Sequence, residues 1–189
     1  MTEVNRENAL DLVKEYTNSE SLMKHMYAVE AVMRAYATKL GEDENVWGIT
    51  GLLHDFDYEK WPNPNHDQTE HPFPGAKILR EKGYPEEMVE AILGHAEYSG
   101  VARTTKLAKI LYAVDELCGF VMASALVRPE RFEGMKPKSV KKKLKDKRFA
   151  AAVSRENIQA GIQSMLNEFG IDETTHIQTV IDAMKTANL

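Results

Sequence analysis

The sequence predicts an all-α fold, and three observations carry this prediction. Apolar residues recur at intervals of three and four along most of the chain, whereas the alternation typical of strands is nearly absent. Capping residues, glycines and prolines stand at the ends of these periodic stretches. The chain has 189 residues, 43% of them hydrophobic, which is enough for a sizeable core. We therefore predict one compact helical bundle over 1–189.

The N-terminal part predicts three helices. The first is expected over about 5–17. The second begins after Ser19, a plausible N-cap, and ends at Gly41, with one continuous apolar stripe between them. The third is expected over about 43–56. A long polar loop follows, and its prolines exclude a helix there; they stand at positions 62, 64, 72 and 74. Its length indicates a functional loop or lid.

The remainder of the chain predicts six further helices, separated by glycines and prolines. They are expected at about 74–82, 86–96, 104–127, 137–147, 154–169 and 172–187. The last two are amphipathic, and their apolar faces are expected either to pack on the core or to form a dimer. A monomer and a homodimer both fit this pattern.

Composition excludes several classes of protein. With one cysteine, Cys118, the chain forms no internal disulfide and no thiolate metal cluster, so nitrogen and oxygen must hold any metal. No stretch approaches the roughly 18 apolar residues of a membrane span, and the N-terminus lacks the layout of a secretory signal. We expect a cytoplasmic protein without a membrane partner.

The net charge of −5 is unevenly distributed. Residues 136–148 carry eight Lys or Arg against one Asp, so this segment has a charge of +7 and the remainder about −12. Such a segment either serves an anionic ligand or is a solvated helix face without a specific role. The overall acidity disfavours a nucleic acid as the partner.

Three polar residues fall on the apolar faces of predicted helices. His25 lies three residues after Leu22, and His95 three residues after Ile92. A lone inward histidine is more often a satisfied core residue than a ligand. Asp115 also points inward, and a buried carboxylate requires either a paired Lys or Arg or a bound metal.

The adjacent pair His54-Asp55 ends the third helix in the segment GLLHDFDYEKWP. Neighbouring residues on a helix diverge by about 100°. The pair therefore suits a site in which the imidazole binds one ion and the carboxylate bridges to another. The dipeptide alone does not decide this, because His and Asp also adjoin by chance.

The metal-capable residues follow a fixed order: His25, His54-Asp55, His71, His95 and Asp115. The later ones stand in the motifs LLHD, HPFPGAKIL, GHAEYSG and LYAVDEL. This pattern, over about 19–127, resembles the HD-domain metal-dependent phosphohydrolase superfamily, and within it the small stand-alone bacterial hydrolases of HDIG type. The resemblance implies an HD core over 19–127 and a C-terminal helical extension over 128–189.

Two departures from related patterns narrow this resemblance. Phe56-Asp57 stand where HDIG-type proteins have Ile-Gly. The GYP signature of HD-GYP proteins is missing, because Gly83-Tyr84-Pro85 lies elsewhere and is typical of an ordinary helix break. Cleavage of cyclic dinucleotides is therefore disfavoured.

The resemblance also implies two divalent ions. Residues matching His25, His54, Asp55 and Asp115 hold the first, and those matching His71 and His95 hold the second, with Asp55 as the bridge. Nitrogen and oxygen donors suit Mn, Fe, Co, Ni, Zn or Mg. The implied activity is hydrolysis of a small phosphate ester, with nucleotides among the candidates, by a metal-activated water.

Further residues are candidates for substrate contacts. Besides Asp55, we expect Asp57 and Glu59 in catalysis, where they relay a proton unless they cap a helix or face solvent. Lys60 and Arg103 are candidate phosphate donors, although either also fits a surface cation. Arg128 and the run Lys141-Lys142-Lys143 would close over an anionic substrate if the basic helix folds back. Trp61 is a candidate for stacking a base, Trp47 is expected in the core, and His66 and His176 are expected to be exposed and without a role.

Three other functions remain as alternatives. The first is a di-iron oxygenase, because some HD-fold proteins that resemble the same six-residue pattern have that activity. A non-catalytic HD module that senses a nucleotide is the second. Nucleic-acid binding through residues 136–148 is the third, and the acidity of the rest of the chain opposes it.

Overall fold

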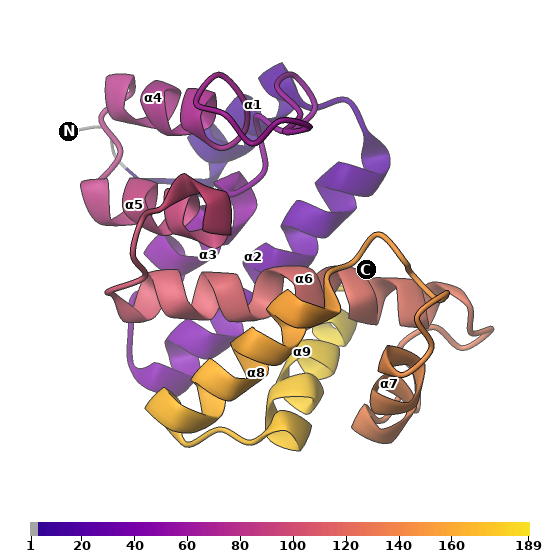
Figure 1. Ribbon diagram of the computed structural model, residues 1–189. Helices are drawn as coiled ribbons and strands as arrows, with labels where there is room; N and C mark the ends of the chain where they lie inside the picture. Colours follow the sequence, from indigo (N-terminus) through magenta and orange to yellow (C-terminus); the bar gives the residue numbers. More distant parts are fainter. Residues whose placement is uncertain (1–3) are drawn as a thin grey trace.

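The computed structural model of the protein describes residues 4–189 and confirms the all-α prediction (Figure 1). This part of the chain forms nine α-helices and one 3₁₀ turn, without a strand. Residues 1–3 of the expected single domain lie outside the described residues. None of the described helices combines the length and apolar character that crossing a membrane requires.

The N-terminal helices follow the predicted caps. Helix α1 covers Arg6–Tyr16, and α2 covers Glu20–Leu40. Ser19 caps α2, since its Oγ accepts a hydrogen bond from the Leu22 amide. Gly41 ends it in the left-handed region with φ of 71°, a conformation that favours glycine.

Helix α3, Glu44–Leu53, packs closely along α2. A side chain at Gly51 would place its Cβ 3.0 Å from the backbone of α2, so glycine permits the approach. The helix ends three residues before the predicted boundary at 56. From His54 onward the chain tightens into successive turns, in which the Tyr58 amide donates to the Asp55 carbonyl at 3.0 Å.

Two short helices follow the polar loop. Helix α4 covers Phe73–Glu81, and α5 covers Glu86–His95, which leads into the 3₁₀ turn Glu97–Ser99. Pro74 stands both among the prolines expected to exclude a helix in the loop and at the start of the helix expected over about 74–82, and the second placement is confirmed. It lies in the first turn of α4, where the missing amide hydrogen has no helical partner to lose.

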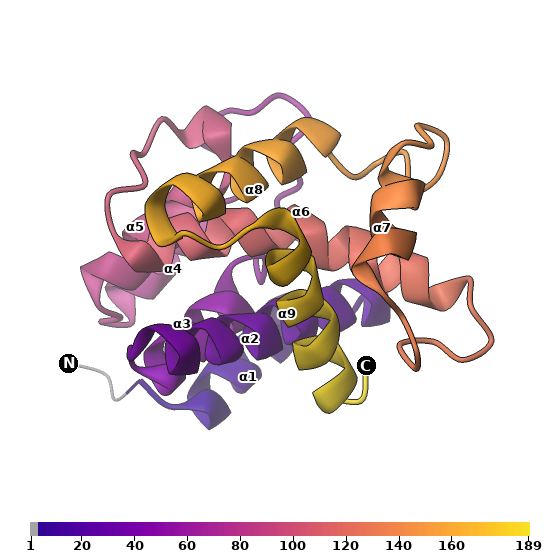
Figure 2. The ribbon, with the colours of Figure 1, turned by 90° about the horizontal axis from the view of Figure 1, so that it is seen from below.

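Helix α6, Lys106–Leu126, is the centre of the fold. It contacts α2, α5, α8 and α9 (Figures 1 and 2). Most of its residues are buried, as its apolar sequence predicts. One inward carboxylate, Asp115, is placed among these neighbours.

The C-terminal helices pack on this core. Helix α7 covers Pro137–Leu144, α8 covers Arg155–Phe169 and α9 covers Glu173–Thr186. Helix α8 lies across α6 and α9 lies against both α2 and α6 (Figure 2). Of the two roles expected for their apolar faces, packing on the core is the one observed.

One predicted exposure is wrong in this region. His176 of α9 is fully buried and not exposed. The Tyr36 hydroxyl donates a hydrogen bond to its Nδ1 at 2.5 Å, and its Nε2 donates to the Ala113 carbonyl at 3.2 Å. Trp47, by contrast, is buried in the core as predicted.

Candidate metal centre

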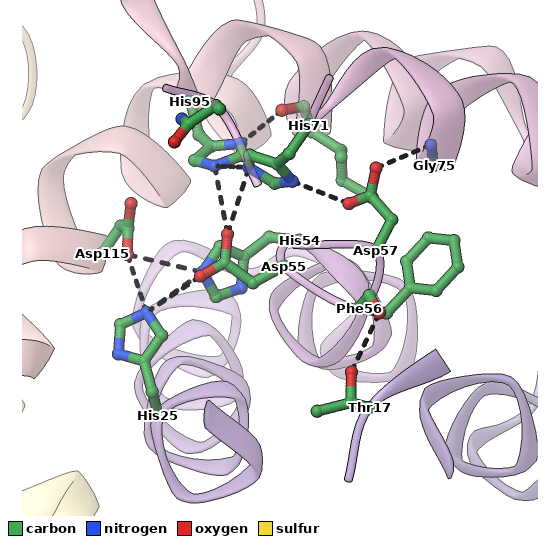
Figure 3. Close-up of polar contacts among 12 residues, drawn as sticks. Thr17, His25, His54, Asp55, Phe56, Asp57, His71, Gly75, His95 and Asp115 are labelled. Carbon is green, nitrogen blue, oxygen red and sulfur yellow. Dashed lines mark hydrogen bonds and ion pairs between the residues drawn. The ribbon is translucent and has the colours of Figure 1, made fainter. Parts of the chain in front are cut away.

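Five segments bring the six predicted metal-capable residues together (Figure 3). Helix α2 supplies the first histidine, the end of α3 the His-Asp pair, and the residues before α4 the next histidine. Helices α5 and α6 supply the last two. The residues are His25, His54, Asp55, His71, His95 and Asp115. Positions 90 residues apart in sequence thus share one site.

The first group of donor atoms consists of His25, His54 and Asp115. The Nε2 atoms of His25 and His54 are 3.2 Å apart, and the Asp115 Oδ1 lies 2.9 Å and 3.4 Å from them. Ligands that sit about 2.1 Å from one ion at ordinary coordination angles are separated by about 3.0–3.4 Å. These three atoms therefore fit around one ion.

The second group consists of Asp55, His71 and His95. The two Nε2 atoms are 3.2 Å apart, and the Asp55 Oδ1 lies 3.3 Å and 3.4 Å from them. The other oxygen of Asp55 faces the first group, 3.4 Å from the His54 Nε2 and 3.7 Å from that of His25. Asp55 thus presents one oxygen to each group.

Hydrogen bonds fix three of the four imidazoles. The Nδ1 of His54 donates to the Gly51 carbonyl at 2.7 Å, and that of His95 donates to the Ile92 carbonyl. The Nδ1 of His71 donates to the Asp57 carboxylate at 2.7 Å. A proton on Nδ1 leaves the Nε2 lone pair free and directed into the site, as in metal-binding histidines.

The electrostatics of the cluster favour a cation. Burial opposes the ionisation of Asp55 and Asp115, but the neighbouring histidines hold the pKa of both carboxyls well below the usual range. Burial also opposes a charge on His54 and His95, yet the two aspartates raise the pKa of both. No Lys or Arg of residues 4–189 lies within 4 Å of the Asp115 carboxylate. The alternative that Asp115 forms a buried ion pair with a Lys or Arg is therefore wrong for the described residues.

Asp57 and Glu59, two candidates for proton relay, belong to neither group of donor atoms and do not line the cavity beside them. The Asp57 carboxylate is buried and accepts hydrogen bonds from His71 and from the Gly75 amide at 2.7 Å. A side chain at Gly75 would overlap it, with Cβ 2.6 Å from the Asp57 Cγ. Glu59 accepts hydrogen bonds from the Asn18 and Ser19 amides, just before α2. Asp57 therefore orients the His71 imidazole, and Glu59 caps a helix start.

The candidate phosphate donors also have other partners. Lys60 lies over the rings of Tyr16 and Trp61, with Nζ 4.7 Å and 4.8 Å from their centroids. Trp61 itself packs against Tyr16. Arg103 donates to the Gly94 carbonyl at 2.9 Å. Neither cation, nor Trp61, lines the cavity beside the cluster.

The basic segment does not fold back over the site. Arg128 donates to the backbone carbonyls of Arg131 and Glu133. Lys141 pairs with Glu173 of α9 at 2.7 Å. Helix α7 projects beside the far end of α6 (Figure 1). None of these cations lines the cavity.

A cavity of about 650 Å³ opens onto the cluster. Several residues that the sequence did not single out line it, among them Tyr58, Asn63, Glu97, Tyr98, Glu116, Val153 and Asn157. His66, expected to be exposed, is exposed, but its ring also stacks on Tyr98 at 4.3 Å and lines the cavity. Glu116 adjoins the inward Asp115 in sequence, which is the one signal that pointed to it.

Glu116, which lines this cavity, has a carboxyl whose pKa is shifted from its ordinary value. Burial and the charge of Asp115 raise the pKa of its carboxyl to about 7. Its Oε2 accepts a hydrogen bond from the Ser154 amide at 3.0 Å.

Comparison with models of known protein families places the segment that carries the six clustered residues in one family. The model of the HD domain family matches residues 22–119, which is more than half of the chain and includes all six clustered residues. No solved structure matches the chain.

Proposed function

We propose that this chain, which belongs to the HD-domain family, is a phosphohydrolase that acts on a small phosphate ester with two divalent metal ions. The observation that carries the proposal is the position of Asp55. Its two oxygens face two separate groups of donor atoms, which is the arrangement that a carboxylate bridging two ions requires.

The donor set fits such ions. Four imidazole nitrogens and two carboxylates converge without a Lys or Arg among them. Such nitrogen and oxygen ligands suit Mn, Fe, Co, Ni, Zn or Mg. His25, His54, Asp115 and Asp55 would hold the first ion, and His71, His95 and Asp55 the second.

Two divalent ions lower the pKa of a bound water to about 7 and offset the charge of a phosphoryl group. The residues of the chain supply the frame for this chemistry. Asp57 and the backbone carbonyls of Gly51 and Ile92 hold three imidazoles in the tautomer that leaves Nε2 free. The adjoining cavity of about 650 Å³ has room for a small ester.

The partner that this proposal requires is the substrate alone. The cations of residues 136–148 do not line the cavity, so the proposed site does not use them to bind a nucleic acid. A monomer suffices for the proposed site, because all six ligands come from one chain.

Phosphate release by the reconstituted protein tests the proposal. The metal-free chain is loaded anaerobically with Mn²⁺, Mg²⁺, Co²⁺ or Zn²⁺ and assayed against a broad panel of phosphate esters. We expect product without dioxygen, and a loss of about 10³-fold or more in kcat/KM after Asp55→Asn. Two bound ions without release from any ester would overturn the proposal. Oxygen uptake only with iron would establish the oxygenase instead, and nucleotide binding without turnover the sensing module.

A further inference from the structure

Part of the cavity wall lies beyond the segment that the HD family model matches. Val153 and Asn157 come from the start of α8 and the loop before it, and they line the cavity beside Glu116 and Gly119 of α6. Helices α6 and α8 lie side by side in both views (Figures 1 and 2). Residues outside the matched segment therefore shape the space next to the six clustered residues.

The loop that carries Val153 is held firmly in place. Arg155 donates to the carbonyls of Ala150, at 2.5 Å, and of Val153, at 2.8 Å. Its guanidinium also lies over the Phe120 ring of α6, 4.8 Å from the centroid. The segment that carries Val153 is thus fixed against α6 by these contacts.

The lining of the cavity is rich in acidic side chains. Of the described residues that line it, four are carboxylates and none is Lys or Arg; the carboxylates are Asp55, Glu97, Asp115 and Glu116. When all four are ionised, they offset the charge of two divalent cations. In that state a loaded cavity would have no surplus positive charge for the several negative charges of a nucleoside diphosphate or triphosphate.

The two glutamates of the wall differ in their availability. Glu97 accepts a hydrogen bond from the Tyr112 hydroxyl at 2.8 Å and lies 3.7 Å from the Arg103 guanidinium. Glu116 uses only Oε2, toward the Ser154 amide. Within residues 4–189 its Oε1 has no hydrogen-bond partner, and neither has the side chain of Asn157. Glu116 and Asn157 can thus accept hydrogen bonds from a ligand.

We propose that Glu116 and Asn157 bind an ammonium group on the leaving group of the substrate, so that the substrate is a phosphomonoester of an amino alcohol and not a nucleotide. This inference rests on the proposed function, because the phosphate end is assigned to the two ions. The half-buried Glu116 carboxylate accepts a charge-assisted hydrogen bond from the ammonium group. The Oδ1 of the Asn157 side-chain amide accepts a second one. Glu116 is a specificity-determining residue in this assignment.

Binding of two matched phosphonates tests the inference without turnover. The probes are 3-aminopropylphosphonate and propylphosphonate, whose C–P bond is not open to ester hydrolysis. Their Kd values for the Mn²⁺-loaded protein are measured by calorimetry, anaerobically at pH 8, where an alkylammonium group stays protonated. We expect the amino compound to bind about tenfold or more tightly, as for close charge pairs at interfaces.

Two variants of equal charge change locate the effect. Glu116→Gln is expected to reduce the ratio of the two Kd values to about one or two. Glu156→Gln is the matched control, because Glu156 is an exposed residue of α8 that does not line this cavity. It should retain the full ratio. A ratio near one in the wild type, or a ratio that survives Glu116→Gln, would overturn the inference.

A third variant tests whether the leaving group occupies this wall. A Cβ at Gly119 would meet Val153 at 3.9 Å and His25 at 4.0 Å, which is ordinary contact, and alanine favours a helix over glycine. Gly119→Ala is therefore expected to keep or raise Tm while weakening both propylphosphonates severalfold relative to inorganic phosphate. Unchanged relative affinities would contradict the assignment of the leaving group to this wall.

The fate of the proposed function is separable in the same experiment. Inorganic phosphate that binds the loaded protein, with equal Kd values for the two phosphonates, removes the ammonium site and leaves the phosphohydrolase proposal standing. If neither inorganic phosphate nor either phosphonate binds, both proposals fail together.

Discussion

Two regions of the molecule bury histidines beside α6, and they do so in opposite ways. At the candidate metal centre the Nε2 atoms of His71 and His95 are 3.2 Å apart, and those of His54, His71 and His95 lie 3.3–3.4 Å from carboxylate oxygens. In the core between α2, α6 and α9, both nitrogens of His176 have partners of their own, Tyr36 and the Ala113 carbonyl.

Burial alone does not distinguish a candidate metal-binding histidine from a core histidine. His54 and His176 are both fully buried. What separates them is the pKa and its cause: nearby aspartates raise that of His54, whereas burial lowers that of His176 to about 4. The first environment favours a cation and the second favours a neutral ring.

Asp55→Asn should have the largest effect. An amide offers one oxygen and cannot bridge two ions, so we expect kcat/KM of the loaded protein to fall by about 10³-fold or more, since such ions supply several kcal/mol. Activity is measured at matched metal concentration, and the Tm of the metal-free variant serves as the control for folding. Activity within tenfold of the wild type would show that no bridge is needed.

The second largest effect should be a loss of folding stability at acidic pH, caused by the protonation of His176 in the unfolded chain. Its ordinary pKa is 6.5 and its pKa in the folded chain is about 4, so only the unfolded chain is protonated between these values. The stability from the neutral ring is complete above about pH 6.5 and is lost as the pH falls toward 4, by about 3 kcal/mol.

Urea unfolding of the metal-free wild type and of His176→Gln, from pH 7.5 to 4, measures this loss. The free energy of unfolding of the wild type should fall more steeply than that of the variant. Parallel curves would contradict a neutral His176. An NMR titration of the imidazole gives its pKa directly and does not depend on the variant folding.

Asp57→Asn should weaken metal binding by about 10–100-fold, because the amide cannot accept hydrogen bonds from both His71 and the Gly75 amide. The loss is expected for the ion held by His71 and His95, as measured by titration with Mn²⁺. Glu59→Gln is the matched control from the same motif, since Glu59 caps a helix start. Equal losses in the two variants would remove the special role of Asp57.

Tyr36→Phe should have the smallest effect. It leaves the buried Nδ1 of His176 without its donor, which costs about 1–3 kcal/mol of stability. Metal content should be unchanged, because this pair lies apart from the six ligands. Loss of metal in Tyr36→Phe at full folding would show that the two regions are not independent.

Local patterns predicted most of the fold. Ser19 and Gly41 mark the ends of α2 as their capping and left-handed propensities require. The pattern failed at the end of α3, where turns replace the last helical turn. The same apolar periodicity could have predicted the burial of His176. This residue stands four residues before Val180 and eight before Met184, on one buried face of α9.

The site was predictable only in part. The six metal-capable residues stand in motifs, and the structure brings them together. The partners that distinguish Asp57 from Glu59 lie in other segments, at Gly75 and at Ser19, so their separate roles have no local signature. Asn157 reaches the cavity through the crossing of α8 over α6, which no spacing in the sequence encodes.

Metal content is the most direct measure of a two-ion centre. The wild type, His54→Ala, His95→Ala and His176→Ala are purified anaerobically and analysed by plasma mass spectrometry. We expect about two equivalents in the wild type and in folded His176→Ala, loss of most metal in His54→Ala, and loss of about one equivalent in His95→Ala. A wild type that binds no metal under any supplementation would contradict this expectation, and the clustered histidines would then be core residues like His176.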